Sequence, residues 1–295
     1  MVRSFHHRDF PASLVASAKR GRTVSVCIPA RDEQDTVGAT VLAIRRELME
    51  RVAVVDELIV MDDGSGDGTA AAARDAGATV VAAAGVLPEH AGGPGKGEAM
   101  WRALHVSSGE VIVFVDADVR GFDPAFVLGL AGPLLTRDDV DFVKGFYERP
   151  LDGRPGEGGR VTELMARPLI SVFFPHLSPL HQPLAGECAG RREVLESVPF
   201  VGGYGVDLGL VIDVAGRLGT AGMVQCDLGT RVHRNRPLSD LRPQALAVLQ
   251  VGLRRAGLAG GQWPAALRLP GAEPLPVPFV ELPPMGEVAA HRKSA

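Results

Sequence analysis

The feature that most constrains the fold is a short apolar run that ends in two aspartates. Residues 111–115 are all β-branched or aromatic, which predicts a central strand covered on both faces of a sheet. Asp116 and Asp118 follow directly, with Ala117 between them. Ligands of open α/β sheets sit outside the carboxyl ends of the strands, so we expect these carboxylates to meet a ligand. Their oxygens suit Mg²⁺ or Mn²⁺; an acidic, solvated turn is the alternative interpretation.

The composition allows a large core and excludes several classes of partner. The chain has 295 residues and is 46% hydrophobic, enough for one extended domain or for one domain with a subdomain. A net charge of −4 gives no basic bias, so we expect neither nucleic acid nor an anionic membrane as a partner. The apolar runs are too short for a transmembrane helix, and the first twenty residues do not resemble a secretory signal.

The three cysteines indicate a reducing compartment. Cys27, Cys188 and Cys226 are too few and too scattered for a disulfide framework or a zinc site. We interpret them as reduced, small core residues, which is typical of a protein of the cytoplasm.

Apolar strand-length runs alternate with helical patterns through the first third of the chain. Strands are expected at 23–28, 57–61 and 79–81, with a helix in each interval. This order predicts an α/β fold with a mostly parallel sheet flanked by helices. Because the crossovers are right-handed, the polar loops that follow the strands should converge on one crevice.

A glycine-rich loop at 92–98 precedes a predicted helix that ends near Val106. It is not a standard phosphate-binding loop, because Gly97 follows Lys96 where Ser or Thr is required. We expect the loop to present Lys96 at the start of the helix, where its ammonium could reach a diphosphate. A solvated lysine in a flexible turn is the alternative.

Two further segments combine cationic side chains with features that favour anions. A helix is predicted to begin near Arg160, so the preceding glycines would leave backbone N–H groups and a guanidinium at its N-terminus. The alternative is an ordinary flexible helix start. His233 stands among arginines in residues 230–237, a combination that suits phosphate or carboxylate, although a single histidine is usually structural.

The assembled motifs resemble the GT-A glycosyltransferases and, within them, the glucosyl-3-phosphoglycerate synthases of actinobacteria. The likeness covers residues 23 to about 256. Three of its motifs mark only the broad superfamily: residues 24–30 with Glu33, residues 62–65, and residues 116–118. The narrower family is indicated by the lysine loop, the arginine-bearing helix start and the histidine stretch together.

This resemblance implies a fold, an activity and a division of the chain. The fold would be GT-A, a Rossmann-like and mostly parallel sheet with a smaller C-terminal acceptor-binding part. The activity would be metal-dependent, retaining transfer of glucose from UDP-glucose to the 2-hydroxyl of 3-phosphoglycerate, performed by a homodimer. The expected parts are an N-terminal extension, a nucleotide-sugar half, an acceptor half and a proline-rich arm or tail, at 1–22, 23–148, 149–259 and 260–295.

The resemblance also assigns residues to four roles. The implied donor site consists of Pro29, Ala30, Glu33, Asp63, Lys96, Asp116 and Ala117. The implied acceptor site consists of Gly159, Arg160, Val161, Thr162, Asn235 and Arg236. The divalent ion, Mg²⁺ or Mn²⁺, would be held by Asp118 and His233, and the catalytic residues would be Lys96, Arg160 and Asp207.

Two departures from the family pattern keep alternatives open. Arg31 and Asp32 replace the usual Leu-Asn beside the base pocket. A mannosyl-3-phosphoglycerate synthase that uses GDP-mannose, or another soluble GT-A glycosyltransferase, is therefore an alternative, and a catalytically silent nucleotide-sugar binder is a third. Asp207 replaces a longer glutamate, which leaves its reach to a sugar or acceptor hydroxyl open. No well-matched carboxylate nucleophile is evident, so we favour front-face attack over a covalent intermediate.

Overall fold

The computed structural model describes residues 2–90, 93–149, 159–231, 237–258 and 265–288. Three of the predicted site residues, His233, Asn235 and Arg236, lie outside these ranges. No helix within the described ranges is both long enough and apolar enough to cross a membrane.

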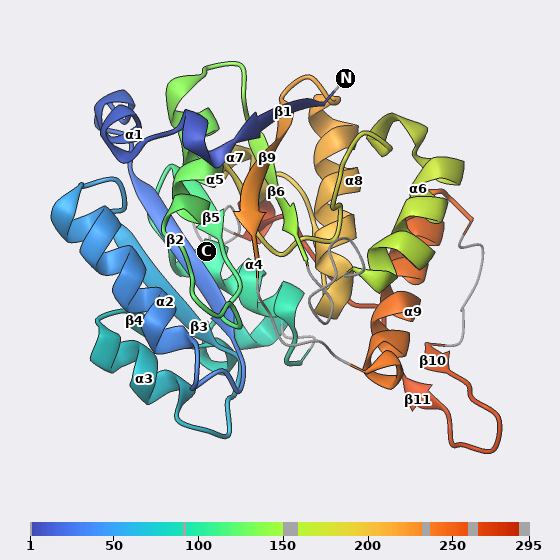
Figure 1. Ribbon diagram of the computed structural model, residues 1–295. Coiled ribbons are helices and arrows are strands. Elements are labelled where there is room, and N and C mark those ends of the chain that lie inside the picture. Colours follow the sequence, from blue (N-terminus) through green and yellow to red (C-terminus); the bar gives the residue numbers. More distant parts are fainter. Residues whose placement is uncertain (1, 91–92, 150–158, 232–236, 259–264, 289–295) are drawn as a thin grey trace.

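An eight-stranded sheet forms the centre of the molecule (Figure 1). Its order is β1-β9-β6-β7-β5-β2-β3-β4. The strands are β1 (Arg3–His6), β2 (Val24–Ala30), β3 (Glu57–Asp62), β4 (Thr79–Ala82), β5 (Val111–Phe114), β6 (Phe142–Glu148), β7 (Cys188–Arg191) and β9 (Met223–Thr230). Only β7 runs antiparallel to its neighbours in this sheet. The prediction of an α/β fold with a mostly parallel sheet is confirmed.

Helices cover both faces of the sheet. The sheet therefore divides the core into two apolar clusters, one on each face. One face is covered by α1 (Ala12–Ala18), α2 (Val37–Ile44), α3 (Thr69–Ala76) and α5 (Ala125–Thr136). The other carries α4 (Lys96–Val106), α8 (Val206–Leu218), α6 (Arg167–Phe173) and α9 (Leu238–Arg255). In Figure 1, α2 and α3 lie on one side of the sheet and α8 and α9 on the other.

Shorter segments complete the chain. A wide helical turn extends α2 through Arg45–Arg51, and another, at Thr162–Ala166, leads into α6. A short helix, α7, spans Arg192–Glu196. Tight single turns occupy His7–Asp9, Ala83–Gly85, Pro88–His90, Pro175–Leu177 and Gly203–Gly205.

The register of the sheet brings the ends of several strands to one edge. The parallel strands β2, β3 and β5 end there, so the loops that begin at Arg31, Asp63 and Val115 share that edge. Because β7 is antiparallel, its first residue pairs with the last residue of β5, and the segment that enters β7 reaches the same edge. The carboxyl end of β9 contributes Arg231.

The described segments near the start of the chain and after α9 pair with the rest of the fold, which their sequence did not indicate. The N-terminal extension supplies β1, which pairs in parallel with β9 at the edge of the sheet. Near the other end, β12 (Glu281–Leu282) pairs with β8 (Phe200–Val201), and β10 (Ala266–Leu267) pairs with β11 (Leu275–Pro276). The indole of Trp101 donates a 2.8 Å hydrogen bond to the carbonyl of Pro283. The described part of the proline-rich arm therefore packs on its own chain.

Candidate active site

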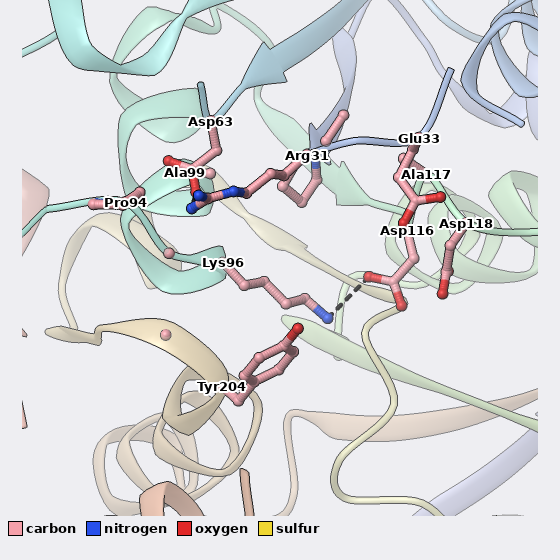
Figure 2. A pocket seen from close by; sticks show the side chains of 14 residues that line it. Arg31, Glu33, Asp63, Pro94, Lys96, Ala99, Asp116, Ala117, Asp118 and Tyr204 are labelled. Carbon is pink, nitrogen blue, oxygen red and sulfur yellow. Dashed lines mark ion pairs between the residues drawn. The ribbon is translucent and has the colours of Figure 1, made fainter. Parts of the chain in front are cut away.

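The seven residues assigned to the donor site line one cavity at the loop-bearing edge of the sheet (Figure 2). The cavity has a volume of about 360 Å³. It is also lined by Asp118 and, on the opposite wall, by Tyr204. In Figure 2 the side chain of Lys96 extends toward Asp116, with Tyr204 beside it. The predicted convergence of three strand-end loops thus brings the expected donor residues together.

Lys96 lies at the first position of α4 and links two carboxylates. Its ammonium is 2.9 Å from an oxygen of Asp116 and 3.3 Å from Oδ2 of Asp207. Burial alone would lower the pKa of Lys96, but the two carboxylates more than offset it and hold this pKa well above the usual value. Lys96 therefore carries a fixed positive charge at the end of the donor cavity.

The start of α4 is held in place by a second acidic side chain. Glu98 is buried, and its carboxylate accepts a 2.8 Å hydrogen bond from the backbone N–H of Gly203. This contact joins the start of α4 to the turn Gly203–Gly205, which contains Tyr204 and directly precedes α8 with Asp207. The position of Lys96 is therefore coupled to the opposite wall of the cavity.

Asp63 occupies the other end of the donor cavity, near the segment where Arg31 departs from the family pattern. The Arg31 guanidinium is 3.9 Å from the Asp63 carboxylate, and in Figure 2 it points toward it. Burial raises the pKa of Asp63 to about 6, and the charge of Arg31 opposes that shift only in part. Asp32, the other departure, caps the neighbouring turn by accepting a 2.8 Å hydrogen bond from Gly66 N–H.

Arg231 has a role at the site that its sequence did not indicate, because there it is only one of several basic residues around His233. This side chain is 3% exposed, and its guanidinium forms ion pairs with Asp116 at 3.0 Å and with Glu187 at 2.8 Å. It also donates a hydrogen bond to Asp118. Tyr147 completes the cluster, accepting from Arg231 at 2.6 Å and donating to Glu187 at 2.7 Å.

The charges of this cluster shift the pKa values of two buried carboxyl groups, Asp116 and Glu187. Burial alone would raise the pKa of Asp116, but Lys96 and Arg231 hold it well below its usual range. Glu187 is completely buried, and burial raises its pKa although Arg231 opposes the shift. The only signal in the sequence was the position of Arg231 at the end of a strand, directly after Gly229 and Thr230.

A second cavity, of about 180 Å³, adjoins the first and contains the four described residues assigned to the acceptor. Gly159, Arg160, Val161 and Thr162 all line it, at the start of the helical segment that leads into α6. Gly159 has a φ of +78°, a conformation that favours glycine. Arg149, Asp207 and Arg231 line the same cavity. Asn235 and Arg236 lie outside the described residues.

The two cavities share one wall. Lys96, Asp116, Asp118 and Tyr204 line both of them. A group bound in the first cavity and a group bound in the second would therefore meet at a boundary formed by an ammonium, two carboxylates and a phenol. This arrangement suits the transfer of a group between two ligands that are bound at the same time.

The shared wall also offers ligands for a divalent cation. The Asp118 side chain is 30% exposed and, like Asp116, presents the hard oxygen donors that Mg²⁺ and Mn²⁺ prefer. Within the described ranges, no group of three or more His, Cys, Asp or Glu residues could hold a metal ion. The second predicted ligand, His233, is not among the described residues, so the carboxylates fit an ion whose other ligands come from a phosphate, water or that histidine.

Comparison with known proteins identifies the family. The glycosyl transferase family 2 model matches residues 25–196, more than half of the chain. The glucosyl-3-phosphoglycerate synthase of Mycolicibacterium smegmatis is 48% identical over 87% of this chain and 85% of its own length. The enzyme of the same name from Petrotoga mobilis is 43% identical, over 86% of this chain and 81% of its own length.

A solved structure resembles the whole molecule. The Mycobacterium tuberculosis glucosyl-3-phosphoglycerate synthase, crystallised with Mn²⁺, UDP-glucose and phosphoglyceric acid, has a TM-score of 0.88 and 41% identity. The match covers 97% of this chain and 99% of that one. Another crystal of that enzyme contains Mg²⁺ and UDP. This chain belongs to glycosyl transferase family 2 and, within it, to the glucosyl-3-phosphoglycerate synthases.

Proposed function

We propose that the protein transfers glucose from UDP-glucose to the 2-hydroxyl of 3-phosphoglycerate, with retention of configuration and with the help of Mg²⁺ or Mn²⁺. The observation that carries this proposal is the wall shared by the two cavities. A donor diphosphate in the first cavity and an acceptor in the second would meet at Lys96 and Asp116. The relatives that contain UDP-glucose, phosphoglyceric acid and a divalent ion in their crystals support the assignment of these ligands.

The donor cavity stabilises the leaving diphosphate. Pro29, Ala30, Glu33, Asp63, Asp116 and Ala117 line the cavity and would contact the donor, and Lys96 would reach its diphosphate. Breaking the sugar–phosphate bond develops negative charge on the departing oxygen, and the fixed ammonium of Lys96 stabilises that charge. Asp118 and His233 would hold the divalent ion, which, when bound, neutralises phosphate charge.

The acceptor cavity supplies positive charge for a doubly anionic substrate. Arg160 and the backbone N–H groups of residues 159–162 would bind the phosphate or the carboxylate of 3-phosphoglycerate, with Asn235 and Arg236. Arg149 lines the same cavity and adds a second guanidinium. Holding both anionic groups fixes the 2-hydroxyl against the anomeric carbon, and such positioning is worth roughly 7–11 kcal/mol of the barrier.

Asp207 orients the lysine and does not form a covalent intermediate. It is 5% exposed, and its Oδ2 is paired with the Lys96 ammonium at 3.3 Å, so this oxygen is already engaged by a cation. We therefore favour attack of the acceptor hydroxyl on the same face from which the phosphate leaves, with the phosphate accepting the proton. A trapped glycosyl adduct on Asp207 would replace this mechanism.

The proposal extends to the organisation of the protein. Residues 23–148 would act mainly on the donor and residues 149–259 on the acceptor. We expect a homodimer, because Leu164 and Val172 are 75% and 70% exposed in neighbouring turns before and within α6, and such side chains often mark interfaces. The three cysteines are buried and unpaired, which supports a cytoplasmic location.

Product formation separates the proposed donor from its rival. Purified protein would be given 3-phosphoglycerate with either UDP-glucose or GDP-mannose, with Mg²⁺ present and again with a chelator. We expect metal-dependent transfer from UDP-glucose. Transfer from GDP-mannose alone would make the protein a mannosyl-3-phosphoglycerate synthase, and bound donor without transfer to 3-phosphoglycerate would show that the acceptor cavity has been misassigned.

A further inference from the structure

A lysine lies buried behind the proposed active site, where neither substrate can reach it. Lys144 is the third residue of β6 and is 1% exposed. Its ammonium has no hydrogen-bond partner within the described chain. Burying a charge without hydrogen bonds is costly, so a side chain of this kind at this place calls for a compensating interaction.

The compensating charge is Asp207. Oδ1 of Asp207 lies 3.7 Å from the Lys144 ammonium, and within the described residues no other carboxylate forms an ion pair with Lys144. The strand neighbours opposite Lys144 are Cys188 and Gln225. Burial raises the pKa of the Cys188 thiol to about 12, so this thiol stays neutral and does not balance the ammonium.

Asp207 is thereby held between two lysines that face different sides of it. Its Oδ2 meets Lys96 and its Oδ1 faces Lys144. Lys96 in turn meets Asp116, so an alternating row of charges runs from β6 to the shared wall of the two cavities. Lys96 and Asp207 line the acceptor cavity, but Lys144 lines neither cavity.

We propose that Lys144 is a positioning residue, whose charge fixes the Asp207 carboxylate so that Asp207 can hold Lys96 at the boundary between donor and acceptor. The inference rests on the proposed function. Stability alone does not account for the charge, because replacing a buried ion pair with apolar side chains is often neutral or stabilising. Lys144 acts through Asp207, and its removal should affect the chemical step more than the binding of substrates.

The test is a double-mutant cycle of Lys144→Met and Asp207→Asn, with Lys144→Arg as the conservative variant. Lys144→Met should lower kcat about 10- to 100-fold, the size expected when a catalytic group is displaced by about 1 Å. The KM values should change much less, and Lys144→Arg should recover part of kcat. In the Asp207→Asn background, Lys144→Met should have almost no further effect, because the residue through which it acts is already altered.

The melting temperatures of the variants test the coupling between Lys144 and Asp207 independently of turnover. Lys144→Met leaves Asp207 paired with Lys96, so we expect its Tm to equal or exceed that of the wild type. Asp207→Asn leaves the buried ammonium unpaired and should lower Tm by about 5–10 °C, and the double variant should recover most of that loss. A purely structural lysine would instead show a fall in Tm that parallels the fall in kcat.

Three outcomes would overturn the inference: unchanged kcat in Lys144→Met, a loss that is simply additive with Asp207→Asn, or no coupling between the two positions in unfolding. Failure of the proposed function is distinguishable. It would appear as a wild-type protein that binds UDP-glucose but transfers nothing to 3-phosphoglycerate, and the unfolding cycle would then decide on Lys144 by itself.

Discussion

Asp63 shows how one buried carboxyl links pH, stability and donor binding. Its pKa is raised to about 6, above its ordinary value of 3.8, so the folded protein binds a proton here more tightly than the unfolded chain. The stability that protonated Asp63 contributes is fully present below about 3.8 and is lost as the pH rises through about 6. At neutral pH, ionised Asp63 therefore destabilises the folded state relative to the unfolded chain.

Asp63→Asn should therefore stabilise the protein and weaken donor binding. Its gain in unfolding free energy over the wild type should grow between about pH 4 and pH 7 and reach the order of 1–3 kcal/mol. The KM for UDP-glucose should rise about tenfold, because the nucleoside loses a charged acceptor. Denaturant unfolding across this pH range and donor kinetics measure the two effects. Asp75→Asn, on the exposed side of α3, is the control, and equal changes in both variants would contradict the assignment.

Gly186 is required by the ion pair next to it. A Cβ at this position would collide with the Asp116 carboxylate and with the Lys96 ammonium, both of which are fixed by each other and by Arg231 or Asp207. We expect Gly186→Ala to lower kcat about 10- to 100-fold by displacing these groups. Gly85→Ala, which meets no atom within 4 Å, is the matched control. Steady-state kinetics of both variants would test the prediction, and a fully active Gly186→Ala would refute the crowding argument.

Single residues also mark the limit of what the sequence predicts about the site. Lys96, Asp116 and Asp118 could be placed because each follows or precedes a recognisable strand or helix. Arg231 could not be assigned to the two aspartates, because both precede it by more than a hundred residues and the direction of its side chain depends on the end of β9. Charge pairing of this kind needs the three-dimensional arrangement.

At the scale of elements, the strands that were predicted are the apolar ones. The runs that form β2, β3 and β5 are buried on both faces, so each is a continuous hydrophobic segment. β1 could not be predicted in the same way. It lies at the edge of the sheet and contains charged and polar residues, so its pairing is decided by its neighbour β9 and not by local pattern.

The N-terminus of α4 packs closely against β8 because Gly97 has no side chain. A Cβ on Gly97 would collide with the backbone carbonyl of Val201, which belongs to β8. Gly97→Ala should lower the free energy of unfolding by about 1–3 kcal/mol, because α4 must move away from β8. Lys96 would move with the helix, so kcat should fall as well.

A glycine in another helix provides the control for that prediction. Gly216 lies in α8, and a Cβ there would meet no atom within 4 Å. Gly216→Ala should raise the free energy of unfolding by about 0.5–1 kcal/mol, since alanine has the higher helix propensity. Chemical denaturation of Gly97→Ala and Gly216→Ala would measure both changes in the free energy of unfolding. Similar effects of the two substitutions would mean that the close approach of α4 to β8 is unimportant.

At the scale of the whole molecule, the protein binds anions although its net charge is −4. It concentrates cations at one edge of the sheet, where Lys96, Arg149, Arg160 and Arg231 line the acceptor cavity. The location of this edge was predictable, since the loops after parallel strands converge. The balance of charge at this edge was not predictable, because it depends on Lys144 of β6 and on Glu187, which directly precedes β7. Only the folded sheet shows that these two side chains lie near the site.

The central claim is that a donor and an acceptor meet at the wall shared by the two cavities, and the structure of the product tests it most directly. Purified protein would be incubated with 3-phosphoglycerate, Mg²⁺ and UDP-glucose labelled with ¹³C at the anomeric carbon, and the product analysed by NMR. We predict one product in which the labelled carbon is α-linked to the oxygen on carbon 2 of the glycerate. A β-linked product, or free labelled glucose in place of a conjugate, would contradict the account.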